Sequence, residues 1–225
     1  NSAWLSWHWK RHAGFDVVTY SGQSGAKNVP HSLGKIPEMM WVKNRTYADA
    51  NGWTVYHKGL NGGTNPEQYR MRLQSTVAED DNNLAWNDTA PTSTHFTLGT
   101  DRMVNQGSFE YIAMLFASVE GVSKVGYYDG SSDGSTPVTV TTGFSPRFVL
   151  IKRADASGDW RIFDTTRGFI KGSGGADCYL DLNSNNSQNC NDDWGYPLDN
   201  GTGFLIAVNT TTGAQNRKYI YYAHA

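Results

Sequence analysis

The feature that most constrains the fold is a short apolar run that occurs twice in the chain. The run at residues 148–153 (FVLIKR) follows a turn that contains Pro146, and it ends in two cations. Residues 39–43 (MMWVK) follow Pro37 in the same way. Continuous β-branched and aromatic runs of this length are typical of strands that are buried on both faces. The sequence therefore predicts the same strand in two places.

Further landmarks match between the two halves at a nearly constant separation. Repeats of this size are domains rather than solenoid turns. We predict two tandem copies, residues 15–121 and 122–225, related by internal duplication. Residues 1–14 resemble the run that precedes the second copy, so we expect a closing strand or linker of a preceding unit and a longer parent protein. The matched pairs are Tyr20 and Tyr128, Pro37 and Pro146, Lys43 and Lys152, Trp53 and Trp160, Trp86 and Trp194, Phe96 and Phe204, and Tyr111 and Tyr219.

The pattern within each copy predicts an all-β fold. Residues 53–57 alternate, which places Trp53 and His57 on one face and Tyr56 on the other. Residues 69–73 alternate too, and we expect both of their arginines to point outward. No window of a dozen residues has a sustained helical period. Several short strands with glycine and asparagine turns predict two antiparallel β-sandwiches in tandem.

Net charge and the length of the apolar runs argue against two classes of partner, nucleic acids and membranes. The formal net charge is −2 and no cluster of lysine or arginine stands out, so nucleic-acid binding is not expected. No apolar run approaches the length that spans a membrane, so membrane insertion is not expected either.

The two cysteines, Cys178 and Cys190, both lie in the second copy. They flank a turn-rich loop, and a disulfide there would stabilise the fold by roughly 2 to 3 kcal/mol. Two free buried thiols are the alternative. The matched positions of the first copy lie near Gln68 and Asn82, so a bridge cannot be what holds the shared fold together.

These motifs resemble a repeated domain of bacteriophage virion proteins, particularly tail fibres of marine and cyanobacterial phages. The residues that carry the resemblance are 143–146 (GFSP), 148–153 (FVLIKR) and 160–168 in the second copy, and 40–45 and 109–116 in the first. Residues 7–15 are similar to the segment that joins one such unit to the next. The resemblance implies a jelly-roll or lectin-like sandwich, location on the virion surface, and no assigned biochemical activity.

No group of residues has the spacing of a catalytic site, so we do not expect an enzyme. No histidine lies near either cysteine in the sequence, which argues against a cysteine nucleophile. Clustered acids could instead hold calcium, which takes six to eight oxygen ligands. The candidate ligands are Asp80, Asp81 and Asn83 in the first copy, and Asp192, Asp193 and Asp199 in the second. Solvated turns are the alternative interpretation.

Carbohydrate binding is the sharper hypothesis, because sugar sites combine an aromatic platform with hydrogen-bonding side chains. Trp53 and Trp160 could instead be core residues, as their matched positions favour. The first candidate set is Trp53, Tyr56, His57 and Lys58, with Trp160, Phe163, Asp164 and Arg167 in the second copy. The alternative platform consists of the loop aromatics Tyr47, Trp86, Tyr127, Trp194 and Tyr196.

The sequence thus predicts a structural virion component, of the tail-fibre type, that binds host-surface polysaccharide. A rigid spacer, assembly unit or capsid-decorating protein without a ligand is the alternative. A secreted carbohydrate-binding module or glycan-active enzyme is the third class. Self-association as a homo-oligomer, such as a trimer, and contacts with other virion proteins are expected from the fibre resemblance.

Overall fold

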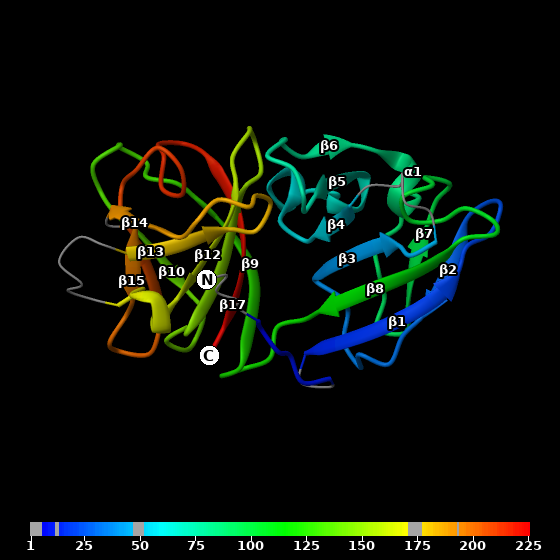
Figure 1. The fold of residues 1–225 in the computed structure, drawn as a ribbon, viewed down its shortest axis with the longest axis horizontal. Coiled ribbons are helices and arrows are strands. Elements are labelled where there is room, and N and C mark those ends of the chain that lie inside the picture. The colour runs from blue at the N-terminus through cyan, green and yellow to red at the C-terminus, as the bar shows by residue number, and fades with distance from the viewer. Residues whose placement is uncertain (1–5, 12–13, 47–51, 171–176, 193) are drawn as a thin grey trace.

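The computed structural model describes residues 6–11, 14–46, 52–170, 177–192 and 194–225 (Figure 1). The fold is all-β, as predicted, and its one α-helix in these ranges is the single turn α1 (Asn83–Trp86). Short 3-10 turns η1 (Leu60–Gly63), η2 (Pro66–Gln68) and η3 (Thr165–Arg167) complete the helical content there. No helix of the described part is long and apolar enough to cross a membrane.

The first copy pairs a large antiparallel sheet with a small one. The large sheet has the order β1-β8-β3-β4-β5-β6, and the small sheet pairs β2 with β7. The strands of the large sheet are β1 (Phe15–Ser21), β8 (Glu110–Phe116), β3 (Met39–Asn44), β4 (Trp53–His57), β5 (Tyr69–Arg72) and β6 (Asp80–Asp81), and those of the small sheet are β2 (Lys27–Pro30) and β7 (His95–Leu98).

The second copy repeats this arrangement strand for strand. Its large sheet reads β9-β17-β11-β12-β13-β14 from one edge, and its small sheet is β10-β16-β15. Among the strands that the structure describes, β15 alone has no counterpart in the first copy. The strands of the large sheet are β9 (Ser123–Asp129), β17 (Lys218–His224), β11 (Phe148–Arg153), β12 (Trp160–Asp164), β13 (Asp177–Asp181) and β14 (Asn189–Asp192), and those of the small sheet are β10 (Val138–Thr141), β16 (Gly203–Ile206) and β15 (Gly195–Pro197).

Matched tyrosines make the same contacts in both copies. Tyr20 stacks on Tyr111 with ring centroids 5.2 Å apart, and Tyr128 stacks on Tyr219 at 5.1 Å. The hydroxyls of Tyr20 and Tyr128 each donate to a loop carbonyl at 2.7 Å. These contacts and the common strand order support the duplication, which itself stays a prediction.

Alternation along each central strand divides its side chains between two cores. In β3, Met39 and Trp41 enter a core that lies between the two copies, whereas Met40 and Val42 enter the core of the first copy alone. The matched strand β11 does the same, because Leu150 joins the core between the copies. The two large sheets therefore face one another across a shared apolar core, with a small sheet on the outer side of each (Figure 1).

The N-terminal segment packs against one end of this shared core, and the expectation of a closing strand or linker of a preceding unit stays a prediction. Residues 6–10 form no strand, and residues 12–13 lie outside the described ranges. The Trp9 ring lies 6.0 Å from Phe15 and from Phe116 in the first copy, and 6.2 Å from Phe148 in the second. Trp9 therefore bridges the two copies at their junction.

The expectation that both arginines of residues 69–73 point outward is also wrong for one of them. Arg72 is exposed, but Arg70 is buried and forms ion pairs with Asp80 and Asp101. The two carboxylates compensate the buried guanidinium, which explains how a charge is tolerated there.

Candidate functional site

Three of the four tryptophans that were candidates for a sugar-binding platform lie in the core. Trp86 and Trp160 are each 1% exposed and Trp194 is 5% exposed. The indole N–H of Trp86 donates to the Tyr69 carbonyl, and that of Trp160 crosses to the carbonyl of Arg72, both at 3.0 Å. The prediction of a loop platform is therefore wrong for Trp86 and Trp194, and the core interpretation is confirmed for Trp160.

The remaining candidates of β4 are divided between the two cores. Tyr56 is buried in the core of the first copy, and Trp53 is half-buried against the core between the copies. His57 is 1% exposed, so it is inaccessible to a sugar. Of the other loop aromatics, Tyr127 is 49% exposed, Tyr196 is half-buried in β15, and Tyr47 lies outside the described residues.

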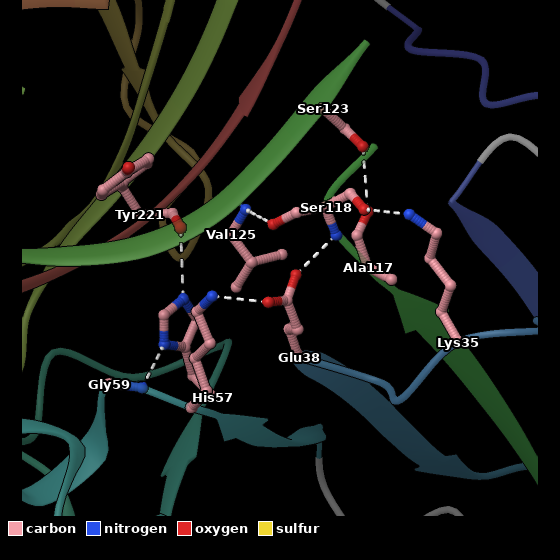
Figure 2. Close-up of polar contacts among 10 residues, drawn as sticks. Lys35, Glu38, His57, Gly59, Ala117, Ser118, Ser123, Val125 and Tyr221 are labelled. Carbon is pink, nitrogen blue, oxygen red and sulfur yellow. Dashed lines mark hydrogen bonds and ion pairs between the residues drawn. The ribbon is translucent and has the colours of Figure 1, made fainter. Parts of the chain in front are cut away.

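His57 lies at the junction of the two copies (Figure 2). The Gly59 N–H donates to His57 Nδ1 at 3.0 Å, so Nε2 carries the proton and donates to the Tyr221 carbonyl at 3.1 Å. Burial is the main cause that lowers the pKa of His57 to about 3; the hydrogen bond to the Tyr221 carbonyl opposes this shift, and the positive charge of Lys58 adds to it. His57 is therefore a neutral residue that fastens the two copies together.

Glu38 organises the rest of this junction (Figure 2). Its carboxylate accepts from Lys58 Nζ and from the backbone N–H of Ser118, both at 2.5 Å. Burial raises the pKa of Glu38, but the bonds from Lys58 and Ser118 outweigh it and hold the pKa below its usual range. The Ser118 hydroxyl accepts from the Val125 N–H at 3.1 Å. These groups are engaged with one another or with backbone, and together they join the two copies.

A shallow hollow of about 650 Å³ lies beside this joint in the first copy. Two lysines line it, and both are engaged: Lys35 Nζ donates to the Ser118 carbonyl at 2.9 Å, and Lys58 is paired with Glu38. Its cations are thus already bound by the protein itself.

The matched place in the second copy carries a groove of different composition. Two adjoining hollows of about 390 and 110 Å³ share three lining residues, Trp7, His8 and Phe148, and we call them together the Trp7 groove. Trp7, Trp9 and Phe148 are each half-buried, so part of each ring is accessible. The groove is completed by Ser6, Arg147, Asp164, Thr165, Thr166, Arg167, His224 and Ala225.

Two predicted ligand residues, Asp164 and Arg167, lie in this groove. Arg167 Nη2 is 2.5 Å from Asp164 Oδ2, in an ion pair that lacks the angle of a hydrogen bond, and both side chains are largely buried. Burial lowers the pKa of Arg167. Asp164 also accepts from the Arg167 N–H at 3.0 Å, which caps η3. Arg167 lies 5.7 Å from the centroid of the Trp7 ring.

Sequence reasoning missed Trp7 and Trp9 as candidate ligand residues. Both belong to the segment that was interpreted as the end of another unit, so their aromatic character was assigned to a strand. The signal that could have found them is the dense spacing of tryptophans in residues 7–9, outside either copy. Trp7 and Trp9 belong to neither sandwich core; they pack against the core between the copies and stay half-buried.

The predicted calcium sites stay predictions, because Asp193 lies outside the described residues and the other ligands are placed as follows. Asp80 is exposed and accepts from Arg70 at 3.1 Å, and Asp81 is exposed on the same short strand. Asp192 lies in β14, and Asp193 falls outside the described ranges. No three acidic, histidine or cysteine side chains gather in the part of the chain that the structure describes.

The two cysteines are joined. Cys178 in β13 and Cys190 in β14 form a disulfide across this strand pair, at a sequence separation of 12 residues. The alternative of two free thiols is therefore wrong. The bridge closes the loop beside a polar hollow lined by Asp181, Asn186 and Gln188.

Fold and site together define a class of protein: an all-β chain of two face-to-face β-sandwiches with an aromatic surface groove. The chain belongs to the family described as a domain of unknown function (DUF7483), whose profile matches residues 6–225. The match therefore takes in both copies and the segment that carries Trp7. Comparisons with curated proteins and with solved structures gave no significant match.

Proposed function

We propose that this chain is a surface-exposed, glycan-binding part of a virion, of the tail-fibre type, and that the Trp7 groove is its binding site. The virion assignment rests on the sequence resemblance. The groove assignment rests on one observation: three half-buried aromatic rings line a hollow together with arginine, histidine, aspartate and threonine side chains. Sugars present apolar faces and dense hydroxyls, and this combination of side chains is complementary to both.

The rest of the molecule supports this choice of site. The cores bury Trp86, Trp160 and Trp194, so these side chains are not accessible to a ligand. In the matched hollow of the first copy, both lysines are already bound by protein groups at the joint. The rigid scaffold beneath the groove is β11, whose Phe148 forms part of the wall. A site on a rigid strand needs little ordering when a ligand binds, which favours affinity.

The test is binding of the whole chain to intact candidate host cells, to their extracted surface polysaccharides, and to an immobilised panel of oligosaccharides. We expect saturable binding that is lost in Trp7→Ala and weakened in His8→Ala. His8 is exposed, so its replacement leaves the core intact. Thr46→Ala, at an exposed position outside the groove, is the control that should bind normally. Failure to bind any cell, polysaccharide or oligosaccharide would refute the proposal, as would full binding by both groove variants when they are folded.

A second function, a rigid spacer or assembly unit without a ligand, is favoured by the core between the copies. The shared core joins residues of both large sheets, which makes the pair of sandwiches a single stiff body. Such a chain would bind no glycan and would form a defined homo-oligomer, for example a trimer, or bind another virion protein. Sedimentation equilibrium measures the oligomer, and the absence of glycan binding in the test above distinguishes this outcome from the first function.

A further inference from the structure

The two matched hollows differ in charge at one position. Pro37 matches Pro146, so Glu38 in the first copy corresponds to Arg147 in the second. Both residues lie at the same place relative to the sheet, because Glu38 precedes β3 and Arg147 precedes β11. Their backbones confirm this match: the Glu38 N–H donates to the Phe116 carbonyl and the Arg147 N–H to the His224 carbonyl, each at 2.8 Å.

The acid of the first copy neutralises its basic neighbour. Glu38 pairs with Lys58, which matches Arg167, and it also accepts from the Ser118 N–H. The first hollow thus holds an internal ion pair that is tied to the joint between the copies.

In the second copy a different residue neutralises Arg167, and a second arginine, Arg147, is also present. Asp164, at the position that matches His57, is paired with Arg167. Arg147 is exposed, and among the described residues no side chain forms an ion pair or hydrogen bond with its guanidinium. The Trp7 groove therefore carries one uncompensated arginine next to accessible aromatic rings.

We infer that the Trp7 groove binds an anionic sugar, whose carboxylate or sulfate pairs with Arg147 while its ring lies against Trp7. This inference rests on the proposed function and specifies its ligand class. The planar guanidinium presents paired donors that match the two oxygens of a carboxylate. Threonine hydroxyls at 165 and 166 line the same groove and are suited to the hydroxyls of the sugar. A neutral glycan would leave the cation without a partner.

The test compares acidic oligosaccharides with their neutral counterparts. The probes are uronic-acid oligosaccharides and their carboxyl-reduced forms, and sulfated oligosaccharides and their desulfated forms, titrated into the whole chain by calorimetry. We expect at least one acidic probe to bind about tenfold or more tightly than its neutral counterpart. The affinity should fall as ionic strength rises, because the partly exposed charge pair is screened.

The variants exchange the residues that the two copies carry at this matched position. Arg147→Glu restores the charge of the first copy and should abolish binding of the acidic probe, whereas Arg147→Lys should retain part of it. Lys27→Glu, on β2 of the first copy, changes the net charge equally and should bind like the unchanged chain.

The outcomes separate this inference from the function on which it rests. Equal binding of acidic and neutral forms, or full binding by a folded Arg147→Glu chain, would overturn the anionic ligand while leaving glycan binding in place. Binding of neutral probes alone would have the same meaning. If no probe binds and no host polysaccharide binds either, both proposals fail together.

Discussion

His57 Nε2 donates to the carbonyl of Tyr221 at 3.1 Å, and this bond joins β4 of the first copy to β17 of the second. The same imidazole accepts from the Gly59 N–H through Nδ1. Protonation of Nδ1 would break the second contact and place a charge in a buried site beside Lys58. The joint between the copies therefore requires a neutral histidine.

This requirement predicts a pH dependence of stability. The pKa of His57 is lowered from its ordinary value of 6.5 to about 3 in the fold, so the unfolded chain binds more protons between these values. His57 should therefore contribute its full stability above about pH 6.5 and lose it progressively as the pH falls toward 3. Urea denaturation of the unchanged chain at several pH values measures the slope.

The matched variants isolate the contribution of this residue. His57→Leu leaves the Tyr221 carbonyl and the Gly59 N–H without their partner and should cost about 2 to 5 kcal/mol at neutral pH. It should also flatten the slope between pH 6.5 and 4, whereas His8→Gln, at an exposed position, should not. An unchanged slope in His57→Leu would contradict the assignment.

Lys152 predicts a second pH dependence, at the alkaline end. It is fully buried in β11, and its Nζ donates to the carbonyls of Thr76 and Arg153 at 3.2 and 2.6 Å. Burial lowers its pKa to about 8, against the raising effect of the nearby carboxylates of Asp159, Asp155 and Glu79. Between this value and the ordinary lysine pKa the unfolded chain binds more protons, so stability should rise with pH.

The first copy provides the control for this effect. Lys43 occupies the matched position in β3 but is only half-buried. Lys152→Met should remove the rise in unfolding free energy between about pH 8 and 9.5, and Lys43→Met should leave it unchanged. Guanidinium denaturation across this pH range measures both. Identical curves for the two variants would show that burial of Lys152 is not the cause.

Matched tryptophans predict an asymmetry between the copies. Trp160 is 1% exposed and donates across the junction to the Arg72 carbonyl, whereas Trp53 is half-buried. Trp160→Ala removes a large buried ring and should cost about 3 to 5 kcal/mol, and Trp53→Ala clearly less. Denaturation of the two variants side by side measures the difference. Equal losses would mean that both tryptophans contribute equally to the core between the copies.

Local patterns predicted the strands, because alternation and apolar runs reflect how a strand is buried. The doubled run at residues 39–43 and 148–153 became β3 and β11, the central strands of the two large sheets. The pattern at residues 53–57 also placed Trp53 and Tyr56 on opposite faces, in different cores. Such features depend on each copy alone.

The candidate site was harder to predict because it depends on how distant parts of the chain pack together. Trp86 and Trp194 lie in polar, loop-like sequence, yet both fill the sandwich cores. The alternation of residues 69–73 predicts that Arg70 points outward, and only the fold brings Asp101 into contact with it. The Trp7 groove combines residues 6–9 with β11 and η3, which are far apart in the chain. No local sequence pattern predicts that these segments come together.

The disulfide predicts a stabilisation confined to the second copy. Cys178 and Cys190 join β13 to β14, the edge of the second large sheet, and the first copy has no cysteine at the matched positions. In the chain-entropy model a loop of this length contributes about 2 to 3 kcal/mol. Because the bridge lies at an edge, reduction should loosen β14 without opening the core between the copies.

Hydrogen exchange before and after reduction tests where this stabilisation acts. The double variant Cys178→Ser and Cys190→Ser should lose protection in β13 and β14, while the amides of β3 and β8 in the first copy keep theirs. The same variant should still bind any glycan that the Trp7 groove recognises, since the groove is lined by other elements. Loss of protection across both copies would show instead that the edge of the second sheet is coupled to the shared core.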